Sequence, residues 1–492
     1  MLRRAPWTFG SGPAVARLFG VLLALVSLGA WLSLGAQVRG LVGSHGLLPL
    51  GDFVEAARDA NVAHLSRLPT IFLWTQSDAA LTAGIAAGTA LSLAALLGLR
   101  RRLCFALMAA LYLSFAVACR VFLSFQWDNL LLECGLLACF LPAHRTAPVA
   151  HFLFRVLLFK LYFESGLAKW QSPLGDWHDG SAMTVYYETA PLPTALAWYA
   201  HNLPAWWHHL ESRATLAFEL ALPFAVFGPR RARLLAAAGF TLFQLVNAAT
   251  ANYGFFCYLA VALHVFLLDD ADLARMERFL LPRPRPAPPP PGPAGRVLAP
   301  LGAAVYLLLS AAQASFHFTE GEPGRLLTAV APTLDTVSTL RLVNTYHLFA
   351  SITRERIEPE LQTLASGDGD EDADWTPHDL RHKPGALGRR PDFVAPHQPR
   401  LDFQLWFHGL AFQRGAPPYL QMLLERMCED AAAVRPFFSD EPRDRLPDRP
   451  RAVRVVYWQY HFTTPAERRA TGAWWRRERL AATRPVLCAG TP

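Results

Sequence analysis

Residues 14–34 read AVARLFGVLLALVSLGAWLSL, an apolar run whose single charge is Arg17 near its start. A helix that crosses a bilayer needs about 20 apolar residues, and this run has that length. Arginines before an apolar core are also typical of signal peptides, but the run is long for a cleaved segment and predicts a retained anchor. Working outward, further runs that predict membrane helices lie at 78–98, 103–123, 129–142, 148–167, 214–228, 234–251, 253–268 and 297–316. The sequence therefore predicts a polytopic α-helical membrane domain of about nine helices.

The composition agrees with a membrane protein. The chain has 492 residues, of which 52% are hydrophobic and 17% are charged, whereas soluble domains are nearer one quarter charged. A net charge of +7 is compatible with nucleic-acid binding in general. Here, however, the basic residues flank apolar runs and form no stripe with aromatic residues, so we expect a membrane protein without a nucleic-acid partner.

The basic residues also predict an orientation. With the N-terminus in the cytoplasm, most arginines fall in inside segments, including the cluster at 100–102 and those at 230–233. Cytoplasmic loops of membrane proteins carry such an excess. The outside loops then hold only Arg39, Arg58, Arg67, Lys169 and Arg213. Nine crossings place the C-terminal part on the extracytoplasmic side.

The chain divides at residues 282–293, which read PRPRPAPPPPGP and cannot form a helix. We expect a membrane domain at 1–281, a Pro-rich linker at 282–296, a last membrane helix at 297–317 and a soluble domain at 318–492. The soluble domain is expected to be α+β. Its predicted strands lie near 345–364, 376–382 and 452–463, and its predicted helices lie at 400–412 and 416–430.

Two long outside loops, at 35–70 and 168–213, carry more pattern than ordinary connectors. The first has apolar residues on a helical period between 52 and 65, and the second is rich in Trp, Tyr and His. Aromatic residues of this kind gather at membrane–water interfaces. The loops are therefore interpreted either as interfacial anchors or as the roof of an extracytoplasmic cavity.

Polar residues within the apolar runs are the strongest candidates for a site, because a charge in hydrocarbon costs at least about 2.5–3.5 kcal/mol unless it is paired or lines a cavity. Lys160 and Glu164 are four residues apart and can pair. Two readings stay open: contacts that hold helices together, or a polar site that opens outward with Asp128, Glu133, Glu164 and Lys169 at its mouth. The predicted cluster comprises Gln126, Trp127, Asp128, Asn129, Glu133, Glu164, Lys169, Tyr187, Glu188, Gln244, Asn247 and Asn252.

Cysteines and acidic residues predict little more. Cys428 and Cys488 fall in the soluble domain and are able to pair in an oxidising compartment, a question the sequence leaves open. Asp368, Asp370 and Asp372 alternate like a calcium loop, but Ala373 stands where that loop needs glycine. We therefore expect no metal and no cofactor.

Eight long motifs are spread over nearly the whole chain. They are FQWDNLLLECG (125–135), FESGLAKWQS (163–172), YYETAPLPTALAWYAHNLP (186–204), ANYGFF (251–256), NTYHLF (344–349), HKPG (382–385), RRPDFVAPHQPRLDFQLWF (389–407) and WWRRE (474–478). Together these motifs resemble the lipase maturation factor family. Phe403 stands where the family usually has Trp.

The resemblance implies a membrane-embedded, chaperone-like maturation factor that helps exported proteins, lipases in the family, to fold or assemble. It implies the endoplasmic reticulum membrane for a eukaryotic chain and the plasma membrane for a bacterial one. The expected mechanism is binding without covalent chemistry. A Pro-punctuated loop is expected to dock onto the membrane domain or to bind the client through Arg390, His397, Gln398, Arg400 and Trp406.

An enzyme is the alternative. Residues 166–183, GLAKWQSPLGDWHDGSAM, are distantly similar to the segment of the vitamin K-dependent carboxylase that carries its base lysine. Under that interpretation Lys169 is a catalytic base, because burial makes a lysine useful as a base. A lysine at the end of a membrane helix that extends to the interface is the commoner arrangement.

Overall fold

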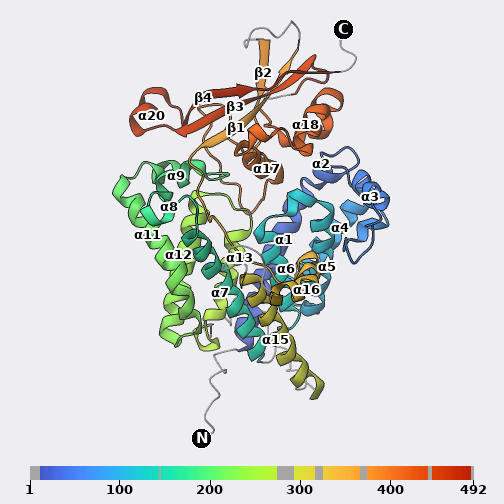
Figure 1. Cartoon of the computed structure of the whole chain (residues 1–492), viewed down its shortest axis with the longest axis vertical. Helices are drawn as coiled ribbons and strands as arrows, with labels where there is room; N and C mark the ends of the chain where they lie inside the picture. The colour runs from blue at the N-terminus through green and yellow to red at the C-terminus, as the bar shows by residue number, and fades with distance from the viewer. Residues whose placement is uncertain are drawn as a thin grey trace.

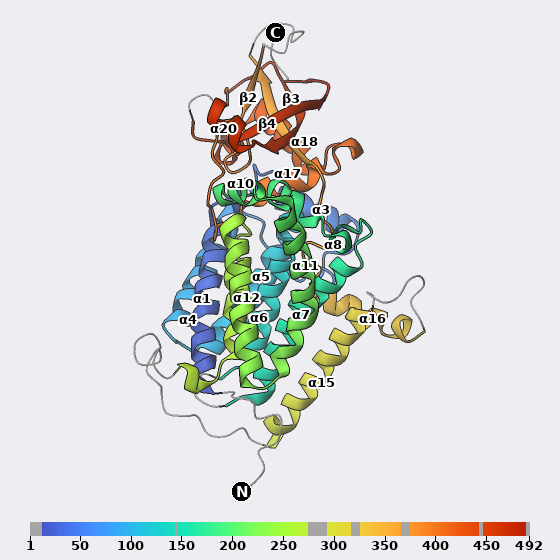
Figure 2. The same ribbon diagram turned by 90° about the vertical axis from the view of Figure 1, so that its left-hand side faces the viewer.

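The computed structural model describes residues 12–142, 146–273, 293–315, 325–365, 374–441 and 446–488. A long helical bundle carries a small β-sheet region at one end, and the N-terminus lies at the opposite end (Figures 1 and 2). The predicted Pro-rich linker lies almost wholly outside the described residues, as do the alternating aspartates at 368–372. One end of the membrane bundle therefore lies against the sheet region. We call the contact region between the two the junction.

The bundle consists of long helices connected near its two ends. Phe19, Phe154 and Phe266, from three separate elements, pack together inside it with ring centroids 4.2–4.7 Å apart. Such aromatic contacts add to the burial of apolar surface. The helices are α1 (Pro13–Gly35), α4 (Asp78–Leu96), α5 (Arg101–Ala118), α6 (Gln126–Ala138), α7 (Pro148–Trp170), α11 (Ala205–Ala221), α12 (Arg230–Thr250), α13 (Phe256–His264) and α15 (Pro293–Ser315).

Among the described residues, five helices are long and apolar enough to cross a membrane: α1, α4, α5, α12 and residues 297–315 of α15. The other predicted spans are shorter or more polar. α6 has 13 residues, the run at 253–268 forms α13 followed by a 3₁₀ turn, and α7 carries charges along its length. A helix that packs among other helices is shielded from lipid and needs less apolar surface. The count of nine crossings therefore stays a prediction.

Arginines and aspartates meet at the end of the bundle where α1 begins. The carboxylate of Asp270 accepts hydrogen bonds from the backbone N–H groups of Ala14 and Val15, at 3.2 and 3.1 Å. Negative charge is favourable at a helix N-terminus, where N–H groups lack partners. Arg233 and Asp269 pair nearby at 2.7 Å. This end lies away from the sheet (Figure 2).

The two long loops lie at the end of the bundle next to the sheet, and both contain short helices. The first loop forms α2 (Val38–Val42) and α3 (Leu50–Asp59), close to the expected helical stretch. The second forms α8 (Asp176–Asp179), α9 (Ala182–Thr189) and α10 (Ala195–His201). Trp177, Tyr187 and Trp198 from this second loop are buried in a cluster with Tyr460 and Trp475 of the sheet region.

The C-terminal sheet is antiparallel, with strand order β2-β1-β3-β4, and β5 pairs with the other end of β3. Two differences from the sequence prediction stand out. First, residues 345–355 do not form a strand, because their backbone groups bind side chains of the bundle. Second, the structure contains a strand, β4, that was not predicted from the sequence. The strands are β1 (Arg356–Leu364), β2 (Trp375–His378), β3 (Ala452–Phe462), β4 (Trp475–Ala482) and β5 (Val486–Leu487).

Most of the remaining helices lie around the sheet or between it and the bundle, whereas the helix at Arg325–Thr339 lies beside α15, away from the sheet (Figure 2). Helix α17 (Arg400–Gly409) lies between β1 and the bundle (Figure 1). The others are α16 (Arg325–Thr339), α18 (Pro418–Glu429), α19 (Ala431–Val434) and α20 (Pro465–Thr471). Because α17 starts at Arg400, it carries the end of the predicted docking loop directly to the membrane domain.

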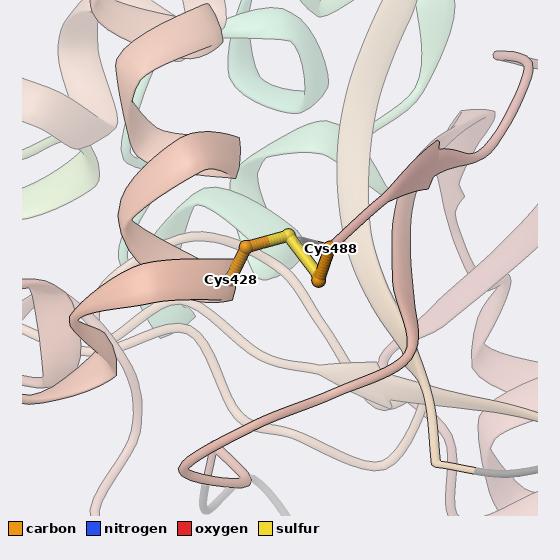
Figure 3. Close-up of a disulfide and its surroundings, with 2 residues drawn as sticks. All are labelled: Cys428 and Cys488. Atoms are coloured by element: carbon orange, nitrogen blue, oxygen red, sulfur yellow. A yellow bond between two sulfur atoms is a disulfide. The ribbon is translucent and has the colours of Figure 1, made fainter. Parts of the chain in front are cut away.

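A disulfide joins Cys428 of α18 to Cys488, just after β5 (Figure 3). The two residues are separated by 60 positions. Closing a loop of this length typically stabilises a domain by about 2–4 kcal/mol. Structural disulfides persist in oxidising compartments.

Candidate functional site

The junction is built first around Glu133, which is fully buried in α6. Its Oε1 accepts hydrogen bonds from Lys160 Nζ at 3.1 Å and from the Tyr306 hydroxyl at 2.5 Å. Its Oε2 accepts from the backbone N–H and side-chain amide of Asn344, at 3.1 and 3.0 Å, and from the Tyr346 hydroxyl at 2.7 Å. One carboxylate thus ties α7, α15 and the NTYHLF segment to α6.

The NTYHLF segment, residues 344–349, continues along the bundle by backbone contacts. The N–H of Tyr346 donates to Glu164 Oε2 at 2.8 Å, and the N–H of His347 donates to Gln126 Oε1 at 2.9 Å. Lys160, which could have paired with Glu164 on its own helix, forms its ion pair with Glu133 on the facing helix, at 3.1 Å. A carboxylate on a neighbouring helix reaches the ammonium more closely than one placed four residues along the same helix.

Lys169, at the sheet end of α7, is 2% exposed. Its Nζ lies 2.7 Å from Glu219 Oε2 of α11 and donates to the Leu348 carbonyl at 2.8 Å. The ammonium also lies 5.3 Å from the ring centroid of Trp177. Both short contacts are to groups of this chain, so the arrangement favours a positioning role for Lys169 that links α7, α11 and the NTYHLF segment.

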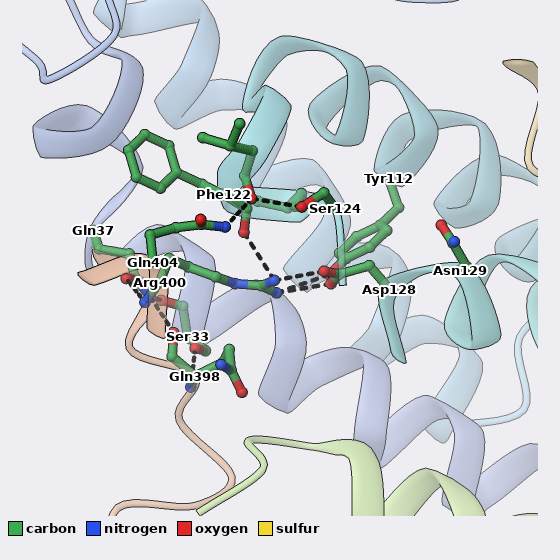
Figure 4. Close-up of polar contacts among 12 residues, drawn as sticks. Ser33, Gln37, Tyr112, Phe122, Ser124, Asp128, Asn129, Gln398, Arg400 and Gln404 are labelled. Carbon is green, nitrogen blue, oxygen red and sulfur yellow. Dashed lines mark hydrogen bonds and ion pairs between the residues drawn. The ribbon is translucent and has the colours of Figure 1, made fainter. Parts of the chain in front are cut away.

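A second buried ion pair connects the two domains directly (Figure 4). Arg400 of α17 makes a bidentate pair with Asp128 of α6, at 2.6 and 2.8 Å, and both side chains are at most 1% exposed. Tyr112 donates to the same carboxylate at 2.6 Å, and Arg400 also reaches the Phe122 carbonyl at 3.1 Å. Planar, two-point contacts of this kind give both energy and fixed geometry.

The loop before Arg400 binds the ends of two bundle helices. The side-chain oxygen of Asn252 accepts from the N–H groups of Val394 and Ala395, at 2.7 and 3.1 Å. His397 Nδ1 lies 3.0 Å from the Ser33 hydroxyl, which also accepts from the N–H of Gln398. The predicted docking loop is thus held on the bundle through both its side chains and its backbone.

Glu188, in α9, attaches the second long loop to the sheet. Its carboxylate lies 3.0 Å from His461 Nδ1 and accepts from the N–H of Phe462 at 2.7 Å. Burial alone would raise the pKa of Glu188, but the hydrogen bond from His461 and the nearby His201 outweigh burial, so the pKa is lowered. Arg356 of β1 donates to the backbone carbonyls of Glu188 and Pro191, at 2.9 and 3.0 Å.

The other predicted residues lie around the same junction, with two exceptions. Gln244 and Asn247 of α12 line a cavity that is described below, and Lys169 and Tyr187 line the same cavity from the junction. Two of the others contact aromatic rings: the ring centroids of Trp127 and Phe125 are 4.8 Å apart, and the Arg390 guanidinium lies 6.0 Å from the Trp474 ring centroid. Three form hydrogen bonds: Asn129 accepts from Arg341 at 3.2 Å, Tyr187 donates to Glu211 at 2.9 Å, and Trp406 donates to the Thr189 carbonyl at 2.9 Å.

One charged cluster was missed. Glu358 of β1 lies between Arg356 at 2.7 Å and Lys383 at 2.6 Å, and all three side chains are at most 3% exposed. Burial lowers the pKa of Lys383, and the adjacent Glu358 carboxylate partly opposes this effect. Lys383 belongs to the HKPG motif, so the motif pointed to one member of this cluster. The strand pattern around Glu358 did not indicate that its carboxylate is buried.

A polar groove lies between the two domains, with a volume of about 840 Å³. We call it the junction groove, and its lining includes Gln37, Arg39, Arg381, His382, His397 and Asp402. It combines residues of the first long loop with residues of the docking loop. The groove is therefore a surface that exists only when the C-terminal domain is seated on the bundle.

The junction is expected to weaken in acid. Burial lowers the pKa of His382 and of His397 to about 4, with neighbouring positive charge adding to the effect. The ordinary value near 6.5 applies to the unfolded chain, so the unfolded state binds protons first. Stability present above pH 6.5 is then lost as the pH falls toward 4, by on the order of 1–3 kcal/mol. Unfolding midpoints measured between pH 7.5 and 4.5 check this expectation.

His397→Asn should reduce this acid dependence, because it removes one of the two titrating rings. His64→Asn is the matched control, since His64 is exposed and lies away from the junction groove. An unfolding midpoint that does not change between pH 7.5 and 4.5 in the unsubstituted protein contradicts the prediction.

Comparison with known protein families identifies both halves of the junction. The profile described as "Lipase maturation factor transmembrane domain" matches residues 14–275, more than half of the chain. The profile described as "Lipase maturation factor C-terminal domain" matches residues 342–485. The chain belongs to the lipase maturation factor family. Both halves of the Asp128–Arg400 and Glu133–Tyr346 contacts fall within these two matched domains.

Individual lipase maturation factors match along most of their length. Lipase maturation factor 2 of Rattus norvegicus is 29% identical, with 97% of this chain and 83% of the relative covered. Lipase maturation factor 1 of Homo sapiens is 30% identical, with 94% of this chain and 86% of the relative covered. No solved structure matches the chain. The chain is therefore a membrane protein of the maturation factor family.

Proposed function

We propose that this protein is a membrane-embedded maturation factor that binds exported proteins, lipases among them, while they fold or assemble. The observation that carries the proposal is the seating of the C-terminal domain on the membrane domain through buried charges. Arg400 and the NTYHLF segment use side chains that would be costly to bury without partners. A rigid two-domain surface next to the membrane suits a protein that holds another chain during folding.

The proposal places the C-terminal domain on the extracytoplasmic side, where exported proteins fold. Two features support that side. Arg17, Arg101 and Arg233 lie at the opposite end of the bundle, because Arg101 donates to the Arg17 carbonyl and Arg233 pairs with Asp269 near the start of α1. Basic residues of membrane proteins gather on the cytoplasmic side. The Cys428–Cys488 disulfide lies in the C-terminal domain and is typical of an oxidising compartment.

Binding without covalent chemistry is sufficient for this role. Large apolar side chains are exposed on the second long loop and on the adjoining part of α11, including Trp170, Leu196, Tyr199 and Trp206, each 51–65% exposed. Exposed apolar surface of this kind marks contact with a membrane or another protein. The client would present its own unburied apolar surface to this side of the junction.

A deletion of residues 318–492 tests the proposal in a host that lacks its own copy of the gene. The full chain should restore secreted lipase of normal specific activity, measured as activity per mass of lipase, and should crosslink to the lipase in membranes. The deletion should lose both effects. Arg435→Ala serves as the matched control in the same domain, because its pair with Asp448 is exposed. Fully active lipase in cells that carry the deletion contradicts the proposal.

A further inference from the structure

A separate cavity of about 370 Å³ lies between α7, α11 and α12 of the membrane domain, and the second long loop and the NTYHLF segment close its end nearest the sheet. Its walls are mainly apolar and include Leu161, Met183, Phe218 and Phe243. Figure 2 shows these three helices side by side below the sheet region. The volume lies in the usual range of small-molecule sites, which is about 300–1,000 Å³.

The cavity is bordered by residues that face outward from the bundle. Leu242 and Val246 line it from α12 and are 64% and 44% exposed, and Ala214 lines it from α11 and is also exposed. Helix α12 is one of the helices able to cross a membrane, so its exposed apolar side faces lipid. A molecule dissolved in the bilayer therefore reaches the cavity sideways, between α11 and α12.

One of the residues that line the cavity carries a buried polar atom without a partner in the described part of the chain. Gln244 is 2% exposed, and its Nε2 donates to the Tyr162 hydroxyl at 2.9 Å. Its Oε1 has no hydrogen-bond partner among the residues that the structure describes. An unsatisfied buried acceptor costs about 1–3 kcal/mol, which a ligand carrying a hydroxyl or N–H donor would recover.

The charges around the cavity restrict the ligand. Glu211 and Glu219 both line it, whereas Lys169 is the one cation among the lining residues. Lys169 already contacts Glu219 and the Leu348 carbonyl. A phosphate or carboxylate head group would therefore meet acidic side chains and an ammonium that is already engaged. The lining suits a neutral head group that donates hydrogen bonds.

We propose that this cavity binds a neutral single-chain lipid with a free hydroxyl group, of the monoacylglycerol class. The terminal amide of Gln244 turns toward the cavity, so that its Oε1 accepts from the hydroxyl, and the acyl chain lies along the apolar walls toward Leu242 and Val246. The site differs from the junction groove and does not depend on the proposed role in protein maturation. Its test accordingly uses no client protein.

The test uses the full chain in phosphatidylcholine nanodiscs with a photoactivatable monoacylglycerol that carries an alkyne tag. The methyl ester of the same photoactivatable fatty acid is the matched probe without hydroxyl groups. The monoacylglycerol should label peptides from residues 205–250, and unlabelled monoacylglycerol should compete. The methyl ester should label this region roughly tenfold less, since one net hydrogen bond corresponds to about that factor.

Two variants of adjacent residues sharpen the result. Val246→Trp places an indole across the cavity opening and should reduce labelling at least about tenfold, whereas Leu245→Trp should label like the unsubstituted protein because Leu245 does not line the cavity. Gln244→Leu should remove the preference for the hydroxyl probe, and thermal unfolding identifies any variant that fails to fold. Equal labelling by both probes, labelling elsewhere in the chain, or unchanged labelling of a folded Val246→Trp variant each overturns the proposal.

Discussion

Arg400→Ala is expected to lower the free energy of unfolding by about 3–5 kcal/mol and to release the C-terminal domain from the bundle. The substitution leaves Asp128 fully buried, with the hydroxyl of Tyr112 as its remaining side-chain partner. Thermal unfolding of the detergent-solubilised protein measures the loss. Limited proteolysis of the segments that flank the C-terminal domain measures its release.

The matched control is Arg435→Ala, which breaks an ion pair whose side chains are 43% and 90% exposed. Exposed pairs contribute at most about 1 kcal/mol, so this variant should unfold almost like the unsubstituted protein. The double variant Asp128→Ala/Arg400→Ala should be more stable than Arg400→Ala alone, because no buried charge is left without its counterpart. An Arg400→Ala protein as stable as the Arg435→Ala control contradicts the assignment.

Glu133→Ala is the second substitution with a large expected effect, again about 3–5 kcal/mol. It removes the acceptor shared by Lys160, Tyr306, Asn344 and Tyr346, and it leaves Ser310, at 3.4 Å, as the remaining hydrogen-bond partner of the buried Lys160 side chain. Hydrogen exchange should rise most in residues 344–349, because their anchor is lost. The global stability is measured by thermal unfolding.

Asp335→Ala provides the comparison for this second case. Asp335 pairs with Arg67, and both side chains are more than 60% exposed, so its loss should change stability by less than about 1 kcal/mol. If residues 344–349 exchange at the same rate in Glu133→Ala as in the unsubstituted protein, Glu133 does not hold the segment in place.

The Arg400→Ala variant also distinguishes the proposed client surface from the proposed lipid cavity. If the rigid junction is the surface that receives a client, Arg400→Ala should impair lipase maturation even where the folded bundle persists in the membrane. Lipid labelling of the α7–α11–α12 cavity should persist in the same variant. Helices α7, α11 and α12 form most of the cavity walls, and Glu133 and Glu164 still hold the NTYHLF segment, which adds Leu348 and Phe349 to the lining. The two proposals therefore fail independently of each other.

The α-helical membrane domain and the family could both be predicted from the amino-acid sequence alone. Apolar length and composition are local properties, so the runs at 14–34 and 234–251 indicated helices close to α1 and α12. The motifs around Asp128 and Arg400 were recognisable for the same reason, because each is continuous in the sequence. The predicted cluster already contained Glu133, Lys169 and Asn252, since a charge or amide within an apolar run stands out wherever it later packs.

Partners, in contrast, were decided by the tertiary structure. Lys160 pairs with Glu133 on another helix, and Glu164 instead accepts the N–H of Tyr346 from a segment expected to be a strand. The buried Glu358 cluster and the open carbonyl of Gln244 likewise depend on which surfaces meet. A pattern along one helix shows which of its faces is polar. The identity of the opposite group depends on packing between distant segments, as for Asp128 and Arg400, which are 272 residues apart.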